Sequence, residues 1–315
     1  MSFAKPRRVI AEGDTVILYI SINNIHSFEV KSHITNKHGQ KQEYVHQTSY
    51  GALKVQTLIG KEYGSKISLP KGYAFILQMN CELWTMSLPH RTQILYTPDI
   101  SMILMQLEVK SSSIVIEAGT GSGSLSHYFL RAVQGSGHLF TFDFHESRVD
   151  QARDEFQKHG FGDYVTVAHR DVCTDGFPED LNGKADAVFL DLPAPYKAIG
   201  HVVKALKTTG GRFCAFSPCI EQTQETCLQL EKYGFLEIQT IEILQSEHIV
   251  REKNVPVMDL SFVKEKRAED GSEVKAVRRD EKRPQLPTRR VLTTINTPMQ
   301  QGHTGFLTFA TFLRI

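Results

Sequence analysis

The sequence predicts an α/β protein in which a small all-β domain precedes a doubly wound, mostly parallel sheet. Two observations support this prediction. Residues 14–80 contain short runs typical of strands, separated by Gly, Asn and Lys turns. From residue 98 onward, strand-like runs alternate with helical segments, which is typical of a parallel sheet with helices on both faces.

The N-terminal β domain is expected over residues 1–80. Its runs "TVILYI", "SFEVKSHI", "KISL" and "YAFIL" have the length and composition of strands. Residues 81–110 are expected to form a connecting segment and a helix. The doubly wound domain is then expected over residues 111–315.

The elements of this second domain follow one another in a regular order. "SSSIVIEAG", "GHLFTFDF", "YVTVAHRDV", "ADAVFLDL" and "GRFCAFSP" are expected as strands, and "SLSHYFLRAV", "YKAIGHVVKALK" and "EQTQETCLQLEKYG" as helices. The helix in "ESRVDQARDEFQKHG" places Val149, Ala152 and Phe156 on one face and ends at Gly160. The chain ends on two strand-like runs, "FLEIQTIEIL" and "TGFLTFATFLRI", with no helix between them. This ending predicts an antiparallel edge of the sheet.

A charged segment separates these last two runs. Residues 264–290 hold ten Lys/Arg, six Asp/Glu and few large apolar side chains, so they cannot bury enough surface to offset the entropy of ordering. We expect a disordered insert over 264–300. A nuclear-localisation or nucleic-acid-binding patch is the alternative interpretation.

The composition excludes several classes of protein. No apolar run approaches the length of a membrane span, and the first residues lack the apolar stretch of a signal peptide. The five cysteines form no CxxC pair, so neither a disulfide framework nor a metal site is expected. Residues 1–110 carry twelve Lys/Arg against eight Asp/Glu, whereas the doubly wound domain outside the insert is acidic. A polyanionic partner could therefore dock on the β domain and the insert.

The stretch "IVIEAGTGSGSLS" predicts the cofactor. Gly119, Gly121 and Gly123 form a turn after a strand, where the backbone can approach a ligand closely. The third small residue of the dinucleotide fingerprint is replaced by Ser124, and Glu117 would be a poor neighbour for a pyrophosphate. Glu117 instead suits a ligand with an ammonium group. S-adenosylmethionine, which has no phosphate, is the predicted cofactor, and a nicotinamide-dependent oxidoreductase is the less favoured alternative.

Three further acids end successive predicted strands. Asp143 is expected to accept hydrogen bonds from the ribose hydroxyls, as in NAD sites, and Asp171 from the exocyclic amine of adenine. Asp191, in "FLDLPAP", precedes Pro193 and Pro195, which stiffen its loop at the place where a methyl acceptor would arrive. Each acid could also be a surface residue or a helix cap.

The chain resembles the catalytic subunits of eukaryotic tRNA (adenine-N1)-methyltransferases, which are Rossmann-like class I enzymes that modify adenosine 58 in the T loop. The resemblance rests on "ELWTMSLPHRTQILYTPDI", "EAGTGSGSLSH", "FLDLPAP", "FCAFSPCIEQ" and "GHTGFLTFAT". It implies S-adenosylmethionine contacts at Leu95, Ser122, Gly123, Ser124, Leu125, Asp143, Arg148, Asp171, Val172 and Asp191. It also implies tRNA contacts at Arg91, Gln93, Tyr96, Thr97, Leu190, Pro193, Ser217, Pro218 and Thr304.

The same resemblance implies a nuclear heterotetramer of two catalytic chains and two non-catalytic paralogues. Because the glycine motif is intact here, this chain would be the catalytic one. Asp191 would accept from N6 of the target adenine, orient the base and stabilise the cationic product. A non-catalytic RNA-binding scaffold of the same fold is the second alternative.

Overall fold

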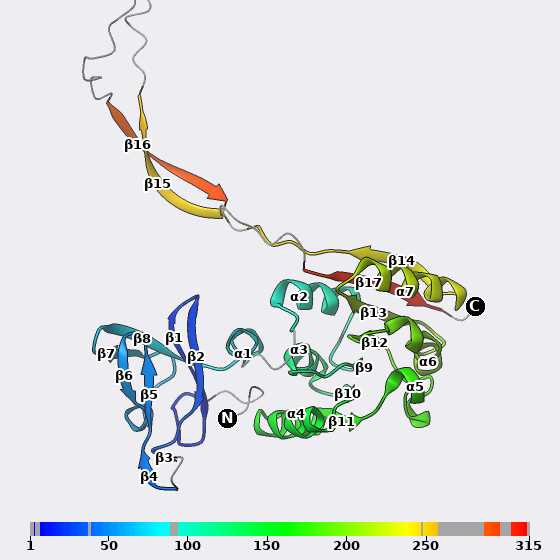
Figure 1. Cartoon of the computed structure of the whole chain (residues 1–315), viewed down its shortest axis with the longest axis horizontal. Coiled ribbons are helices and arrows are strands. Elements are labelled where there is room, and N and C mark those ends of the chain that lie inside the picture. Colours follow the sequence, from blue (N-terminus) through cyan, green and yellow to red (C-terminus); the bar gives the residue numbers. More distant parts are fainter. Residues whose placement is uncertain are drawn as a thin grey trace, which may run out of the picture. The chain divides into compact units, whose positions relative to one another are not determined.

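The computed structural model describes residues 3, 7–36, 39–88, 94–246, 248–257, 287–296 and 304–313. These residues divide into two compact units (Figure 1). The first unit combines Met1–Ile243 with Thr304–Ile315, and the second is Leu244–His303. The expected β domain and doubly wound domain therefore belong to one unit by their contacts.

The first part of the chain forms a small antiparallel structure. Its four-stranded sheet has the order β2-β1-β8-β7, and two hairpins, β3–β4 and β5–β6, accompany it. A separate apolar core that includes Val16, Leu18, Ile67 and Ile76 holds it together. The strands are β1 (Thr15–Ser21), β2 (Asn24–Glu29), β3 (His33–Thr35), β4 (Lys41–Glu43), β5 (Val45–Thr48), β6 (Gly51–Lys54), β7 (Lys66–Leu69) and β8 (Gly72–Gln78).

Two helices connect this β region to the large sheet. Helix α1 (Cys81–Ser87) begins where the Asn80 side chain accepts a hydrogen bond from the amide N–H of Leu83 at 2.8 Å. Helix α2 (Thr97–Gln106) begins with proline in its first turn. Ile100 and Ile103 of α2 are fully buried in the core of the large sheet.

The large sheet has seven strands in the order β11-β10-β9-β12-β13-β17-β14. The central pairs are parallel, whereas β17 lies antiparallel between β13 and β14. The sheet ends in antiparallel strands, as predicted. The last strand of the chain, β17, lies inside the sheet, however, and β14 forms its edge. The strands are β9 (Ile114–Ala118), β10 (His138–Asp143), β11 (Val165–His169), β12 (Ala187–Leu190), β13 (Gly211–Ser217), β14 (Leu236–Ile241) and β17 (Phe306–Phe312).

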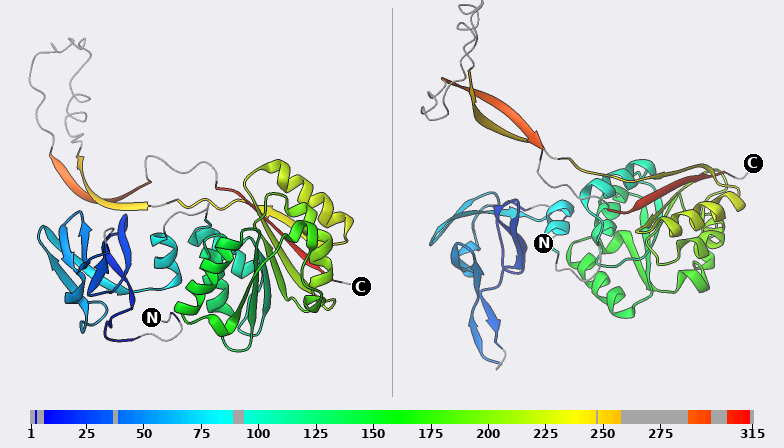
Figure 2. Two further views of the ribbon diagram at one scale, coloured as in Figure 1. Left: turned by 60° about the horizontal axis from the view of Figure 1, so that its bottom comes forward. Right: turned by 45° about the horizontal axis from the view of Figure 1, so that its top comes forward.

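Helices cover both faces of this sheet, as the doubly wound prediction requires (Figure 2). Alternate side chains of β12 enter opposite cores: Phe189 packs with α2, α3 and α4, whereas Val188 packs with α5, α6 and α7. The helices are α3 (Ser124–Val133), α4 (Glu146–Lys158), α5 (Val172–Asp175), α6 (Ile199–Ala205) and α7 (Ile220–Lys232). Among the described residues, no helix is long and apolar enough to cross a membrane.

The second unit contains a hairpin of β15 (His248–Pro256) and β16 (Thr288–Asn296), paired antiparallel. The expected disorder over 264–300 is therefore wrong for 288–296, while residues 264–286 and 297–300 lie outside the described residues. The prediction failed there because it was made from the composition of the whole segment. Strand β16, "TRRVLTTIN", directly follows the charged run, and its β-branched residues favour a strand.

The two units predict how the chain tolerates deletion. The Thr304 amide donates to the Glu242 carboxylate at 3.2 Å, and the Thr304 hydroxyl donates to the Ile243 carbonyl at 3.4 Å. Replacing 244–303 by a short Gly/Ser linker should therefore leave the first unit folded. Circular dichroism should show a cooperative melt within about 5 °C of the full chain, since a loss of about 1 kcal/mol shifts the midpoint by only a few degrees.

Truncation after residue 303 is the matched control. It removes β17 from the interior of the sheet and should abolish the cooperative transition. Loss of folding in the linker variant, or retention of it in the truncated one, would contradict the division into units.

Candidate active site

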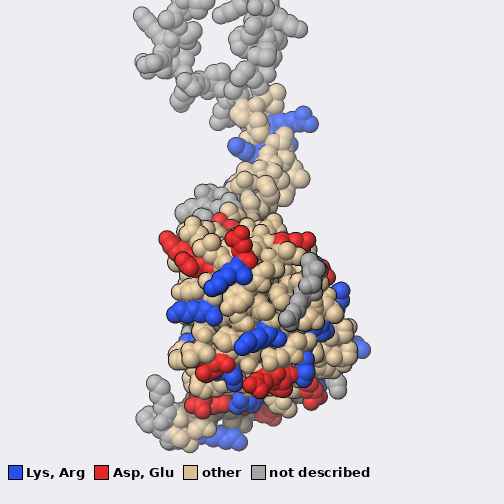
Figure 3. Space-filling model, turned by 90° about the vertical axis from the view of Figure 1, so that its right-hand side faces the viewer, with Lys and Arg blue, Asp and Glu red and all other residues tan. Residues whose placement is uncertain are grey.

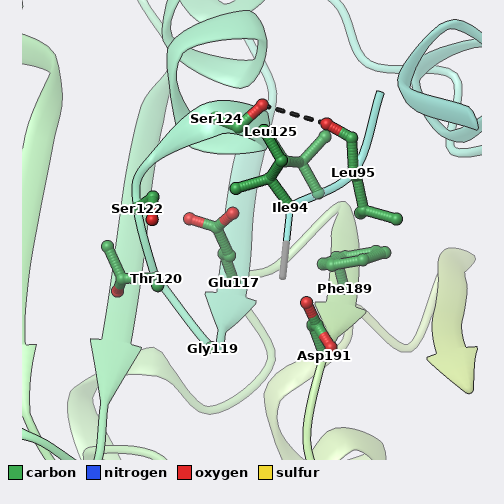
Figure 4. A pocket seen from close by; sticks show the side chains of 11 residues that line it. Ile94, Leu95, Glu117, Gly119, Thr120, Ser122, Ser124, Leu125, Phe189 and Asp191 are labelled. Atoms are coloured by element: carbon green, nitrogen blue, oxygen red, sulfur yellow. Dashed lines mark hydrogen bonds between the residues drawn. The ribbon is translucent and has the colours of Figure 1, made fainter. Parts of the chain in front are cut away.

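A pocket opens at the carboxyl ends of β9 and β12, the neighbouring strands at which the order of the sheet reverses. Ligands of doubly wound sheets bind at this switch point. Figure 4 shows how the side chains that line the pocket are arranged. Its lining is Ile94, Leu95, Glu117, Gly119, Thr120, Gly121, Ser122, Ser124, Leu125, Phe189 and Asp191.

The glycine turn is shaped by the neighbouring strand as well as by the ligand. A Cβ atom on Gly119 would lie 2.2 Å from the carbonyl oxygen of Asp191, and the φ of Gly119 is +100°. The Asp191 amide in turn donates to the Ala118 carbonyl at 2.8 Å. Only glycine allows this approach, which brings Asp191 against the floor of the pocket.

Glu117 is buried beneath the glycine turn, with 1% of its surface exposed. Its Oε2 accepts hydrogen bonds from the hydroxyls of Ser126 at 2.6 Å and Thr141 at 2.7 Å. Burial raises the pKa of Glu117 to about 8, opposed by these two bonds and increased by the nearby charges of Asp191 and Asp143. A cation in the pocket would therefore draw the proton from Glu117 and bind its carboxylate.

Asp143 is held at the end of β10 by backbone groups. Its Oδ2 accepts from the Gly121 amide at 2.9 Å and its Oδ1 from the His145 amide at 2.9 Å. The Arg148 guanidinium lies 3.8 Å from Oδ1. Each carboxylate oxygen can accept a further bond, so the predicted role toward two ribose hydroxyls is compatible with this geometry.

Asp191 is half-buried just beyond β12, level with Gly119 of the neighbouring turn, since Phe189 pairs with Glu117 and Leu190 with Ala118. Burial, followed by the charge of Asp143, raises the pKa of Asp191 to about 6. The carboxyl group therefore titrates closer to neutrality than an ordinary aspartate.

The donor set of the pocket decides which ligand fits. Among its described lining residues are two acids and no Lys or Arg. A pyrophosphate would meet two carboxylates there, whereas the sulfonium and ammonium of S-adenosylmethionine would be attracted to them. In the described part of the chain no cluster of His, Cys, Asp and Glu could hold a metal ion.

Most predicted cofactor residues converge on this pocket. The structure brings together Leu95, Glu117, Gly119, Gly121, Ser122, Ser124, Leu125 and Asp191, with Gly123 and Asp143 directly behind them. Asp171 lies apart from the lining, where its carboxylate caps α5 by accepting from the Cys173 and Thr174 amides. The side chain of Val172 is buried in the core, so only its backbone could meet a cofactor.

The predicted tRNA contacts are less uniform. Arg91 and Gln93 lie outside the described residues. Leu190 is a correction: its side chain is fully buried in the core, because β12 packs on both faces and cannot present it to a substrate. Tyr96 is 46% exposed, the Thr97 hydroxyl bonds to that of Tyr128 at 3.0 Å, and Ser217 is buried at the end of β13. Pro193 and Pro218 are exposed, whereas Thr304 is half-buried against β14.

Three lining residues were not predicted: Ile94, Thr120 and Phe189. Phe189 precedes Asp191 by two positions and points to the same side of β12, so strand alternation could have indicated it. Ile94 comes from the connecting segment, whose path over the pocket is decided by tertiary packing. Thr120 stands within the glycine motif, and its hydroxyl bonds to that of Thr141 at 2.6 Å.

Comparisons with known proteins identify the family of this chain. The model of the family described as tRNA methyltransferase complex GCD14 subunit matches residues 72–312. A tRNA (adenine(58)-N(1))-methyltransferase catalytic subunit of Dictyostelium discoideum is 39% identical over 327 residues, covering 98% of both chains. The corresponding subunit of Candida albicans is 44% identical over 259 residues, covering 81% of this chain and 74% of the relative.

Solved structures show the same fold. An S-adenosylmethionine-dependent O-methyltransferase of Thermotoga maritima is 26% identical, with a TM-score of 0.73 over 97% of this chain and 95% of that one. The tRNA (m1A58) methyltransferase TrmI of Aquifex aeolicus is 19% identical, with a TM-score of 0.69 over 98% and 100% of the two chains.

The close approach at Gly119 predicts a large effect of one methyl group. Gly119→Ala should lower the free energy of unfolding by at least about 3 kcal/mol, because strained backbone alone costs about 1–3 kcal/mol and the added Cβ meets a backbone oxygen. Gly183→Ala is the control: its φ is +68°, but nothing lies within 4 Å of the added atom. It should cost about 1 kcal/mol. Equal losses in chemical denaturation would contradict the constraint.

Proposed function

The chain belongs to the family of tRNA methyltransferase complex GCD14 subunits, and on this basis we propose that it catalyses methyl transfer from S-adenosylmethionine to N1 of adenosine 58 in tRNA. The observation that carries the proposal is the pocket at the switch point, which both Glu117 and Asp191 line. An intact glycine turn beside two acids supports a catalytic role rather than that of a scaffold.

S-adenosylmethionine supplies an electrophilic methyl group when bound. Glu117 and Asp143 would hold the cationic end and the ribose, respectively, while the apolar side chains of Leu95, Leu125 and Phe189 exclude water from the pocket. The chain's own task is to align these groups with the target base, because alignment removes most of the entropic barrier of a bimolecular transfer.

Adenine N1 is a weak nucleophile, and its methylation leaves a positive charge on the ring. Asp191 lines the pocket, so its carboxylate can accept from the N6 amino group and orient the base. Its carboxylate would also stabilise the developing cation. The base must first leave its stacked position, which costs a few kcal/mol.

The proposal predicts that tRNA acquires methyl groups at adenosine 58 when the chain is combined with its non-catalytic paralogue and labelled S-adenosylmethionine. A transcript with guanosine at position 58 should stay unlabelled. Asp191→Ala should keep the fold and tRNA affinity but lose at least about a hundredfold in turnover, since positioned acid–base or electrostatic groups contribute about 10²–10⁴-fold.

Asp191→Asn keeps the shape of the side chain and removes its charge. If the Asn variant kept most of the activity, stabilisation of the cationic base by charge would be contradicted.

Because the raised pKa protonates Asp191 as the pH falls through about 6, the wild-type kcat/KM should fall in the same range. The Asn variant should lack this limb. Near wild-type single-turnover rates in the Ala variant would make Asp191 a structural turn residue. Labelled cofactor that modified no tRNA at all would favour the scaffold alternative.

We also propose assembly with a non-catalytic paralogue in a heterotetramer, and the β15–β16 hairpin supports it. No residue of the hairpin joins the apolar cores of the described chain, and every residue of β15 is exposed. Ile249, Val250 and Leu292 are 45%, 59% and 73% exposed. An isolated two-stranded hairpin is marginally stable in water, so a partner surface would complete it. A nuclear location stays a prediction from the family resemblance.

The charge on one face of the large sheet's domain supports the need for a partner that adds basic surface for tRNA. Figure 3 shows Lys and Arg mixed with Asp and Glu on the face nearest α6 and α7. Such a mixed surface neutralises few phosphates by itself.

The chain alone should therefore bind S-adenosylmethionine yet methylate tRNA poorly. Replacing residues 244–303 by a linker should preserve cofactor binding. It should abolish assembly with the paralogue, as measured by the mass of the complex in light scattering. Full activity of the isolated chain, or unimpaired assembly of the linker variant, would contradict the proposal.

A further inference from the structure

Two buried histidines lie behind the glycine turn, and the proposed chemistry does not use them. His127 of α3 is 0% exposed and His159, after α4, is 4% exposed. The Nε2 atom of His127 lies 2.8 Å from the Nδ1 atom of His159. On its other side, the Nδ1 atom of His127 lies 2.5 Å from the carbonyl oxygen of Gly123.

The chemistry of these contacts fixes the direction of each hydrogen bond. The Gly123 carbonyl can only accept, so Nδ1 of His127 carries the proton. In a neutral imidazole the other nitrogen then accepts, and His159 must donate from its Nδ1. Burial lowers the pKa of His127 to about 4 and that of His159 to about 2, so both rings are neutral at physiological pH.

Aromatic side chains enclose the pair. The ring of Phe3 stacks on His159 at 4.5 Å, and its amide donates to the His159 carbonyl at 2.8 Å. Trp84 meets His159 edge-on at 4.8 Å, and Phe156 meets His127 at 5.0 Å. This enclosure keeps water from competing for the imidazole nitrogens, so the order of donors is maintained.

The acceptor of the chain, Gly123, is the residue from which α3 starts. Its φ is +72°, and its carbonyl accepts from the His127 backbone amide at 3.2 Å as well as from the ring. In a trans peptide the following N–H points opposite to the carbonyl. Fixing the Gly123 carbonyl toward His127 therefore fixes the Ser124 amide on the opposite side, and Ser124 lines the pocket.

We propose that His127, held in one tautomer by His159, is a positioning residue that sets the orientation of the Gly123–Ser124 peptide for cofactor binding. The proposal rests on the proposed function in that the ligand is S-adenosylmethionine. The role of His127 in orienting the glycine turn concerns the free protein, and it can be tested without the cofactor.

Two amide substitutions separate the two contacts of His127. His127→Asn places an NH₂ donor near the position of Nδ1 and can keep the bond to Gly123, whereas His127→Gln places its amide near Nε2 and cannot. Calorimetry with S-adenosylmethionine should give an affinity within about threefold of wild type for Asn and at least about tenfold weaker for Gln, the loss expected for one misdirected donor. His138→Gln, at a half-buried histidine at the start of β10, is the matched control and should bind as wild type.

Hydrogen exchange of residues 119–126 in the free protein gives a readout that does not depend on the cofactor. Backbone amides of residues 119–126 should exchange at least about tenfold faster in His127→Gln than in His127→Asn, compared at equal melting temperature. If the Gln variant fails to fold, His159→Phe preserves the aromatic enclosure, removes the donor and should weaken binding by about threefold or more. Equal affinities and equal exchange in the Asn and Gln variants would overturn the inference, as would unchanged binding in His159→Phe. Absence of cofactor binding by the wild-type protein would contradict the proposed function, and exchange would still decide the role of His127.

Discussion

The contact between Gly119 and the Asp191 carbonyl is the constraint on which the rest of the site depends. Strands β9 and β12 are hydrogen-bonded neighbours, and the chain leaves them toward opposite faces of the sheet. Their loops can cross closely only because Gly119 has no Cβ atom. The crossing brings the acid of one strand and the acid beyond the other to one pocket, and every proposed chemical role follows from that juxtaposition.

Electrostatics then select what the pocket holds. Glu117 and Asp191 both have raised pKa values because burial disfavours their charged forms and the neighbouring acids repel one another. A cationic ligand relieves both effects, whereas an anionic one aggravates them. The pocket therefore discriminates between ligands by their charge. Its preference for a cation also suits a reaction whose product is a cationic base.

The buried groups around the glycine turn form a second layer that controls geometry rather than charge. The hydroxyls of Ser126 and Thr141 orient Glu117, and the His159–His127 pair orients the Gly123 carbonyl. The Ser124 hydroxyl donates to the Leu95 carbonyl at 3.1 Å and so ties the connecting segment to the same turn. Helix α3 thus joins cofactor recognition to the N-terminal part of the chain.

The sequence by itself determined the features that depend on local pattern. Strand–helix alternation determined the doubly wound class, and the glycines beside Glu117 indicated the pocket and its cationic ligand, because backbone freedom and charge are properties of single residues. Tertiary structure alone decided what depends on distant pairing. It placed β17 between β13 and β14, buried Leu190, used Asp171 as a helix cap and joined β16 to β15, which lies more than thirty residues earlier in the chain. Such outcomes depend on which distant partner a strand or side chain finds, and a local pattern leaves that choice open.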